Sequence, residues 1–285
     1  MENKEKERLR QNLEKVAPLF KKEEAVIYLN DKKTLIVADI HGDADALDFI
    51  LEFSEKNKIE SYIFLGDYVD KGPDSIRVLN TLFELKRKHP KKTILLRGNH
   101  ETKEVNKHYE FRTALKKEPD LHEAANDVFE YMPIAVVLNK TVFCVHGGIS
   151  GKKDEMLSDI SKEKPMYYLW NDPGNGTGLM PSLRGGELFR FGADVAEKFL
   201  KRNNLKCIIR GHSSLETGVR FWFDHTLISL YSTLPYSLPD LKAAVAIADG
   251  SRIDFHFYKK EKNGFVWEKK TGFLEISKED GREKE

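Results

Sequence analysis

Five short segments of the chain carry side chains able to bind metal ions: Asp39-Ile40-His41-Gly42, Gly66-Asp67-Tyr68-Val69-Asp70, Gly98-Asn99-His100-Glu101, His146-Gly147-Gly148 and Arg210-Gly211-His212. Their carboxylate, amide and imidazole groups suit Mn²⁺, iron or Zn²⁺, and no thiolate is among them. Two such cations close together activate water and hold a transferring phosphoryl group. The residue types therefore favour a two-metal hydrolase, with phosphoester cleavage as the leading hypothesis.

Each segment taken alone has an ordinary explanation. A lone Asp-x-His is mostly a turn with a surface histidine, and His-Gly-Gly alone could be a turn with a half-buried imidazole. The joint occurrence is what favours a metal site, because at least four segments follow apolar, often β-branched runs and so stand where a strand ends. Their glycines allow the backbone to turn sharply and approach the metals closely.

Alternating elements in the first hundred residues would position these segments. The predicted order is helix, two strands, helix, strand, helix, strand, over residues 4–22, 24–29, 34–38, 44–56, 62–65, 75–88 and 93–96. This order is typical of an α/β sheet, here with candidate ligands after the strands.

The second half of the chain changes character. We expect a longer helical stretch over about 102–131, then a hairpin turning at Asn139-Lys140, a helix, a strand, and a run of antiparallel strands: 134–138, 142–145, 194–202, 205–209, 221–223, 227–231, 243–248 and 253–258. The predicted fold class is α/β (α+β), a sandwich of two packed mixed β-sheets flanked by helices. Residues 1–285 form one domain in this interpretation, with 1–23 an amphipathic helix and 277–285 a charged, frayed tail.

Composition narrows the possible partners and the compartment. Basic residues number 47 and acidic residues 46, so nothing favours a nucleic acid or an acidic membrane as partner. A charged N-terminus argues against a signal peptide. The two cysteines, Cys144 and Cys207, form no disulfide framework, so we expect a cytoplasmic protein. A single glutamine among many Lys and Glu residues favours a thermophilic source.

The motifs resemble the phosphoprotein phosphatase (PPP) family of metallophosphoesterases. The family pattern is Gly-Asp-x-His-Gly, Gly-Asp-x-Val-Asp-Arg-Gly, Gly-Asn-His-Glu, His-Gly-Gly and a late Arg-x-His. The resemblance runs from about Leu35 to Tyr236 and includes three further stretches: Leu95-Leu96-Arg97, Leu169-Trp170-Asn171-Asp172-Pro173 and Phe191-Gly192-Ala193-Asp194-Val195. It implies the calcineurin-like metallophosphoesterase fold and a compact protein serine/threonine phosphatase of the archaeal or bacterial kind.

The resemblance also implies roles for single residues. Two divalent cations, foremost Mn²⁺ with iron or Zn²⁺ as alternatives, would be held by Asp39 and His41, by a bridging Asp67, and by Asn99, His146 and His212. A hydroxide shared by the metals would attack phosphorus in line. His100 would protonate the leaving oxygen and Asp70 would orient His100. Arg97 and Glu101 are supporting charges or ordinary ion-pair partners.

Phosphate-binding residues are less clear from the motifs. Arg184 matches the family's later arginine, and Arg190 is a weaker competitor. Lys71 stands where the family has arginine, and a lysine neutralises phosphate without gripping it through a planar fork. Tyr236 either matches a loop tyrosine beside the active site or is an ordinary strand-end residue.

Three functions compete at this stage. A monomeric phosphatase acting on phosphorylated proteins or peptides is the first. Related bacterial proteins hydrolyse dinucleoside polyphosphates such as diadenosine tetraphosphate, but they tend to depart from Val-Asp-Arg, whereas this chain keeps Val69-Asp70. A non-enzymatic metal-binding scaffold is the third, but loss of catalysis would need a lost ligand, and none of the six is missing.

Replacing Lys71 by arginine tests its assignment to phosphate. Lys71→Arg should tighten inhibition by inorganic phosphate, because the guanidinium offers two parallel donors to the phosphate oxygens. An inhibition constant that does not fall would show that Lys71 has been misread.

Overall fold

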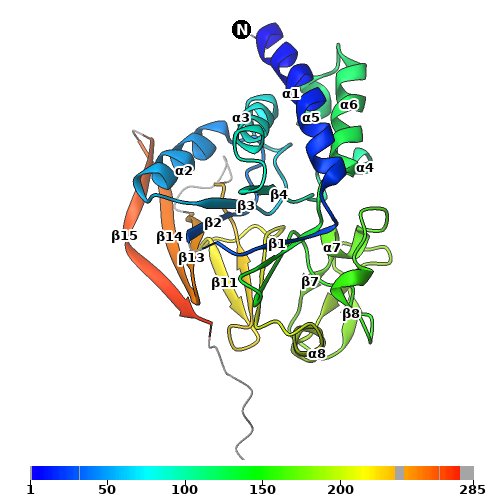
Figure 1. The fold of residues 1–285 in the computed structure, drawn as a ribbon, viewed down its shortest axis with the longest axis vertical. Helices are drawn as coiled ribbons and strands as arrows, with labels where there is room; N and C mark the ends of the chain where they lie inside the picture. Colours follow the sequence, from blue (N-terminus) through cyan, green and yellow to red (C-terminus); the bar gives the residue numbers. More distant parts are fainter. Residues whose placement is uncertain (1, 32, 235–240, 263, 277–285) are drawn as a thin grey trace, which may run out of the picture.

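Two six-stranded sheets lie face to face in the computed structural model, and helices cover the outer face of each (Figure 1). The structure describes residues 2–31, 33–234, 241–262 and 264–276. The predicted sandwich of two mixed sheets flanked by helices is therefore confirmed.

The strands of the described residues form three sheets. The first has the order β1 (Val26–Leu29), β5 (Ala135–Leu138), β6 (Val142–Val145), β10 (Cys207–Arg210), β12 (Leu227–Leu230) and β11 (Val219–Trp222). The second has the order β15 (Gly264–Glu275), β14 (Arg252–Glu261), β13 (Ala243–Asp249), β2 (Lys33–Val37), β3 (Ser61–Phe64) and β4 (Thr93–Leu95). The third is small, with β7 (Asp172–Pro173), β9 (Phe189–Phe191) and β8 (Leu179–Pro181).

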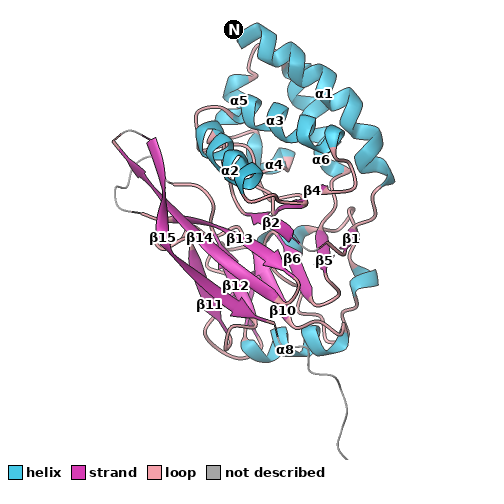
Figure 2. Cartoon of the chain, turned by 60° about the vertical axis from the view of Figure 1, so that its left-hand side comes forward, coloured by secondary structure: helices cyan, strands magenta, loops and turns pink. Residues whose placement is uncertain are grey.

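Helices lie on both sides of this sandwich. Figure 2 shows most of them over the second sheet and α8 at the opposite end. Their bounds are α1 (Glu2–Lys22), α2 (Ala44–Lys56), α3 (Ser75–Lys88), α4 (Lys103–Asn106), α5 (Glu110–Ala114), α6 (Pro119–Glu130), α7 (Met166–Trp170) and α8 (Ala193–Arg202), with a 3₁₀ turn at Leu157–Asp159. No helix among the described residues is long and apolar enough to cross a membrane.

Strand β2 shows how the layers follow from the sequence. Successive side chains of a strand point to opposite faces. Leu35 and Val37 lie in the core beneath the helices, whereas Ile36 and Ala38 lie in the core between the two sheets. All four are fully buried, which explains why the segment is continuously apolar.

The candidate ligands sit at the carboxyl ends of parallel strands. β2, β3 and β4 run parallel in the second sheet, and β6 and β10 run parallel in the first. The loops after these five strands begin at Ala38, Leu65, Leu96, His146 and Gly211. Because the two sheets are packed face to face, loops from both converge at one edge of the sandwich.

Several predictions about the second half of the chain were wrong. The helix expected over 102–131 is three shorter helices, α4 to α6. Asn106 ends α4 and turns its buried amide back to the carbonyl of His100, and Pro119 starts α6 at a position where its missing N–H costs nothing. The expected antiparallel run holds for β11 with β12 and for β13 with β14, but β12 and β13 belong to different sheets, and β8, β9 and β15 had no prediction.

Two other local predictions are confirmed. The hairpin between β5 and β6 turns at Asn139 and Lys140, which have φ values of +49° and +63°. Two successive left-handed residues match the right-handed twist of the strands. The N-terminal helix spans Glu2–Lys22 and buries Leu9, Leu13 and Phe20 against α3 and α6.

Removing the Phe20 ring tests how far α1 is part of the folded domain. Phe20 is fully buried and lies edge-on to Phe83, with the ring centroids 6.1 Å apart. Phe20→Ala should lower the free energy of unfolding by about 3–5 kcal/mol, since it leaves a large cavity. Urea denaturation followed by circular dichroism measures this loss.

The exposed Lys15 on the same helix provides the control. Lys15→Ala should change the free energy of unfolding by less than about 0.5 kcal/mol. Equal stabilities of the two variants would show that α1 is not part of the cooperative core.

Candidate metal centre

Asp67 occupies the centre of the candidate site. It belongs to two groups of converging ligand atoms, one with His41 and His100 and one with His146 and His212, each with its atoms within 4.8 Å of one another. Oδ2 of Asp67 lies 3.5 Å from Nε2 of His41, and Oδ1 lies 3.3 Å from Nε2 of His146. A single carboxylate therefore faces an imidazole on each side, as a residue shared between two metals must.

In the second group, acceptor atoms face one another. Nδ1 of His146 lies 2.9 Å from the carbonyl of Leu65, which can only accept, so in this tautomer Nδ1 carries the proton and the lone pair is at Nε2. That lone pair faces Oδ1 of Asn99 at 3.0 Å as well as Asp67. Nδ1 of His212 also lies 3.2 Å from this Nε2. A cation at this place would satisfy all these atoms.

The first group has the same form with one addition. His41 donates from Nδ1 to the carbonyl of Val69 at 3.0 Å, and its Nε2 faces Oδ2 of Asp39 at 3.7 Å as well as Asp67. The addition is Lys71, whose Nζ lies 2.9 Å from the same Nε2. Here an ammonium group meets the lone pair.

Burial and mutual charge set the ionisation of these groups. Burial and the neighbouring charge of Asp67 raise the pKa of Asp39. Burial also tends to raise the pKa of Asp67, but attraction to His146, His100 and His41 outweighs it and the pKa falls. Burial lowers the pKa of His41 to about 3, so its imidazole is neutral and available as a ligand.

His100 and Asp70 form a separate pair beside the ligands. Nδ1 of His100 lies 2.7 Å from Oδ2 of Asp70. The carboxylate is itself fixed, because its Oδ1 accepts from the main chain of Phe111 at 3.0 Å. Burial tends to lower the pKa of His100, but the charges of Asp67 and Asp70 outweigh it and the pKa rises. The ring can therefore stay protonated at higher pH.

Glu101 holds the loop that carries Asp67. Oε2 of Glu101 accepts from the main-chain N–H of Asp67 at 2.7 Å and of Gly98 at 3.0 Å, and Oε1 accepts from Tyr68 at 2.8 Å. The fully buried carboxylate thus ties the loop after β3 to the loop after β4. This contact agrees with the supporting role expected for Glu101.

Left-handed backbone recurs in these loops. His41, Asp67, Asp70, Lys71 and His212 all have positive φ values, between +46° and +69°. Such conformations cost free energy in non-glycine residues and persist where the surroundings enforce them. The sequence alone gave no sign of this strain.

The residues expected to bind phosphate are placed unequally. Nη2 of Arg184 lies 3.4 Å from the main-chain oxygen of His212, so this side chain reaches the edge of the site. Arg190 instead donates to the carbonyl of Pro181 at 3.2 Å. Tyr236 lies outside the described residues.

Asp172 is a supporting residue that sequence reasoning quoted without assigning a role. It accepts from Nε of Arg184 at 2.8 Å and from Nη2 of Arg210 at 2.8 Å. Arg210 is fully buried and precedes Gly211 and His212. A buried arginine is usually paired with a carboxylate. The arginine of the Arg210-Gly211-His212 motif could therefore have predicted a carboxylate partner such as Asp172.

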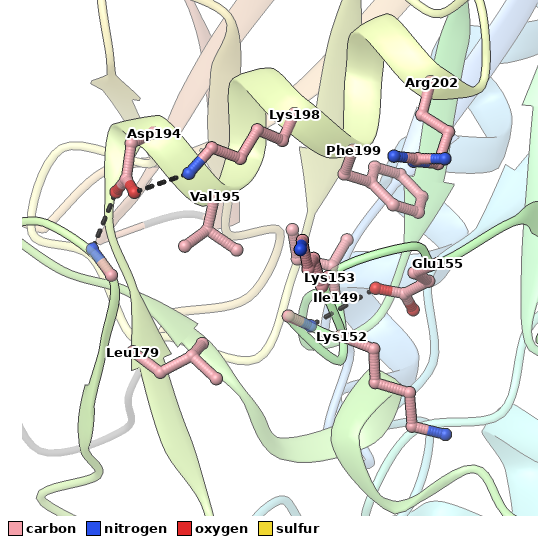
Figure 3. A pocket seen from close by; sticks show the side chains of 12 residues that line it. Ile149, Lys152, Lys153, Glu155, Leu179, Asp194, Val195, Lys198, Phe199 and Arg202 are labelled. Atoms are coloured by element: carbon pink, nitrogen blue, oxygen red, sulfur yellow. Dashed lines mark hydrogen bonds and ion pairs between the residues drawn. The ribbon is translucent and has the colours of Figure 1, made fainter.

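Two hollows differ in their relation to the site, and neither is lined by a candidate ligand. A groove of about 700 Å³ is lined by Arg97, Thr102, Leu169 and Trp170 among others. It borders the centre, since the rings of Trp170 and His212 lie edge-on with centroids 5.5 Å apart. A smaller pocket of about 240 Å³ beside α8, shown in Figure 3, shares none of the candidate ligands.

Comparisons with known proteins agree with this geometry. Residues 32–214 match the calcineurin-like phosphoesterase family. A protein serine/threonine phosphatase from Saccharomyces cerevisiae is similar with a TM-score of 0.76 and 24% identity, covering 97% of this chain and 91% of that one. A cold-active protein-tyrosine phosphatase from a Shewanella species gives 0.59 and 16%, covering 84% and 81%. A putative diadenosine tetraphosphatase gives 0.52 and 19%, covering 81% and 96%.

The chain belongs to the calcineurin-like phosphoesterase family. It is therefore a phosphoester hydrolase, as the motifs predicted. The family's fold implies a dinuclear site for divalent metals, and the residues fit that requirement. Oδ1 of Asn99 and Nδ1 of His212 face Nε2 of His146, and the carboxylate of Asp67 lies between the imidazoles of His41 and His146.

Placing a methyl group at Gly98 tests this arrangement. A Cβ at Gly98 would lie 2.3 Å from both the main-chain nitrogen and Oδ1 of Asp67. Gly98→Ala should therefore displace Asp67 and weaken metal binding by about 10- to 100-fold, the usual cost of disturbing groups that orient ligands. Titration of the metal-stripped protein with Mn²⁺ measures the affinity.

Gly272 in β15 is a matched control, because a Cβ there would make only ordinary contacts of 3.9 Å. Gly272→Ala should bind Mn²⁺ like the wild type. Unchanged binding by Gly98→Ala as well would mean that the position of Asp67 is not critical.

Proposed function

We propose that this protein is a metal-dependent protein serine/threonine phosphatase of the PPP type. The observation that carries the proposal is the His100–Asp70 pair, with its 2.7 Å contact, next to the shared carboxylate of Asp67. A serine or threonine alkoxide is a poor leaving group and needs a proton as it departs. An imidazole kept protonated by a fixed carboxylate can provide that proton.

Six residues would hold the two cations: Asp39, His41, Asp67, Asn99, His146 and His212. When bound, such cations neutralise phosphoryl charge and acidify a water molecule. Mn²⁺ is the favoured metal, with iron or Zn²⁺ as alternatives, because oxygen and imidazole donors accept all three.

The chain's own residues then have separable tasks. Nδ1 of His100 is engaged with Asp70, so Nε2 is the nitrogen free to give its proton to the leaving oxygen. Arg184 lies at the edge of the site, held by Asp172, and can bind a phosphate oxygen as a forked donor. Lys71, whose Nζ lies 2.9 Å from Nε2 of His41, adds a second positive charge within the site.

The groove beside the site supports a polypeptide substrate. Its walls combine apolar residues, Leu169 and Trp170, with charged ones, Arg97, Glu104 and Glu130. Its volume of about 700 Å³ exceeds what a phosphate group alone would need. Such mixed walls suit residues that flank a phosphorylated serine or threonine. The same interpretation implies phosphorylated proteins or peptides as partners.

Hydrolysis of dinucleoside polyphosphates is the second candidate. It is favoured by Lys71, which replaces the arginine of the PPP motif, and by the fold shared with a putative diadenosine tetraphosphatase. The retained Val69-Asp70 favours the first candidate.

Removing the carboxylate partner of His100 should change the pH dependence of hydrolysis. The acid is active below its pKa, and Asp67 and Asp70 raise that pKa against the effect of burial. Asp70→Asn removes one raising charge, so the pKa falls and the alkaline limb of kcat moves to lower pH. The pH profile of phosphopeptide hydrolysis measures the shift.

Asp45→Asn, at an exposed residue paired with Arg77, is the control and should leave the alkaline limb of kcat in place. An unmoved limb in Asp70→Asn would exclude His100 as the acid.

A substrate panel tests the proposed function directly. Metal-loaded enzyme should cleave phosphoserine and phosphothreonine peptides faster than diadenosine tetraphosphate, and a chelator should abolish both activities. His100→Asn should reduce kcat on phosphoserine peptide by about 10²- to 10⁴-fold, the usual contribution of a general acid. The loss on p-nitrophenyl phosphate should be much smaller, since its leaving group needs no proton. Preference for diadenosine tetraphosphate would instead establish the second candidate.

A further inference from the structure

Lys71 directs its ammonium group into the first group of ligands. Nζ lies 2.9 Å from Nε2 of His41, a residue with only 3% of its surface exposed. An ammonium group has donors and no acceptor, so Nε2 must accept through its lone pair. The other ring nitrogen confirms this tautomer, because Nδ1 faces the carbonyl of Val69 at 3.0 Å and therefore carries the proton.

A metal ion at His41 would need the same lone pair. Nε2 is the ring atom that faces the carboxylates of Asp39 and Asp67, at 3.7 and 3.5 Å. One lone pair cannot serve both an ammonium proton and a cation, and two positive charges at one place repel each other. The contact from Lys71 and metal binding at His41 therefore exclude each other.

We propose that Lys71 is a tethered cation that competes with the metal for His41 and must leave before the first site can load. The second group differs: among the described residues, no lysine or arginine hydrogen-bonds to the side chains of Asn99, His146 or His212. The two sites thus load unequally, and the site at His146 binds its metal first.

The backbone around Lys71 suits such a movable group. Its main-chain N–H donates to Glu110 Oε2 at 2.8 Å, which anchors the loop. Asp70 and Lys71 both have left-handed φ values, +69° and +64°, which turn the chain back toward the ligands. The side chain itself is a flexible four-carbon stem in an exposed residue, so it can swing out without moving the anchored loop.

Titration of metal-stripped protein with Mn²⁺ tests the competition. Calorimetry of the wild type should show a tight phase and a weak phase. Lys71→Met should tighten the weak phase by about tenfold or more, which corresponds to about 1.4 kcal/mol, and should leave the tight phase unchanged. Lys71→Arg keeps a charged donor, so its weak phase should have the same affinity for Mn²⁺ as that of the wild type.

Arg184→Met separates contact from general charge. This variant also removes a positive charge beside the site, but Arg184 reaches the main-chain oxygen of His212 and makes no hydrogen bond to His41. It should not tighten the weak phase selectively. Equal tightening by Arg184→Met, or identical titrations for the wild type and Lys71→Met, would overturn the proposal.

Thermal unfolding gives a second readout. In chelator, Lys71→Met should melt at a lower temperature than the wild type, because the buried Nε2 of His41 loses its only donor among the described residues. Saturating Mn²⁺ should raise the melting temperature of the variant more than that of the wild type. Equal shifts would contradict the competition. Neither readout involves a phosphoester. The competition can therefore be disproved while the phosphatase function stands, and the phosphatase function can be disproved while the competition stands.

Discussion

The buried carboxylate of Asp67 is the constraint on which the rest of the site depends. It is almost wholly excluded from solvent and stands between imidazoles of two ligand groups. Three other features hold this carboxylate in place. Oε2 of Glu101 accepts a hydrogen bond from the main-chain N–H of Asp67, and Gly98, which lacks a side chain, leaves room for the oxygens of Asp67. A left-handed φ of +55° at Asp67 turns its side chain inward. Concentrating negative charge in a dry site is costly without cations. The site is therefore built to be completed by metal ions.

Much of this arrangement could be predicted from the sequence because strand ends are easy to recognise. Apolar runs such as Leu35–Ala38 predict strands buried on both faces, and the residue after each run must lie at the edge of a sheet. Parallel neighbours bring those edges together. The hairpin at Asn139-Lys140 and the helix over Ala44–Lys56 also follow from local signals, and the structure confirms both.

The parts that could not be predicted depend on tertiary contacts. Three short helices replace one long one near residues 102–131, and the buried side chain of Asn106 is held at the end of α4 by Asn126 and His122, 20 and 16 residues further along the chain. Asp172 and Arg210 are 38 residues apart, and nothing local couples them before the fold does. The position of Lys71 is of the same kind: its sequence suggested a weak phosphate ligand, whereas its side chain contacts His41. The sequence thus identifies the candidate metal ligands that come together. Only the structure shows which side chains support them, such as Asp172, and which compete with a metal, such as Lys71.

Sharing of Asp67 by two cations is the central claim, and the metal content of an Asp67 variant tests it most directly. Wild-type protein loaded with Mn²⁺ should hold two ions per chain with a magnetically coupled spectrum in electron paramagnetic resonance. Asp67→Asn removes the shared charge, so both ions should bind more weakly and the coupling should vanish. Two Mn²⁺ ions retained by Asp67→Asn with unchanged affinity and coupling would contradict the account.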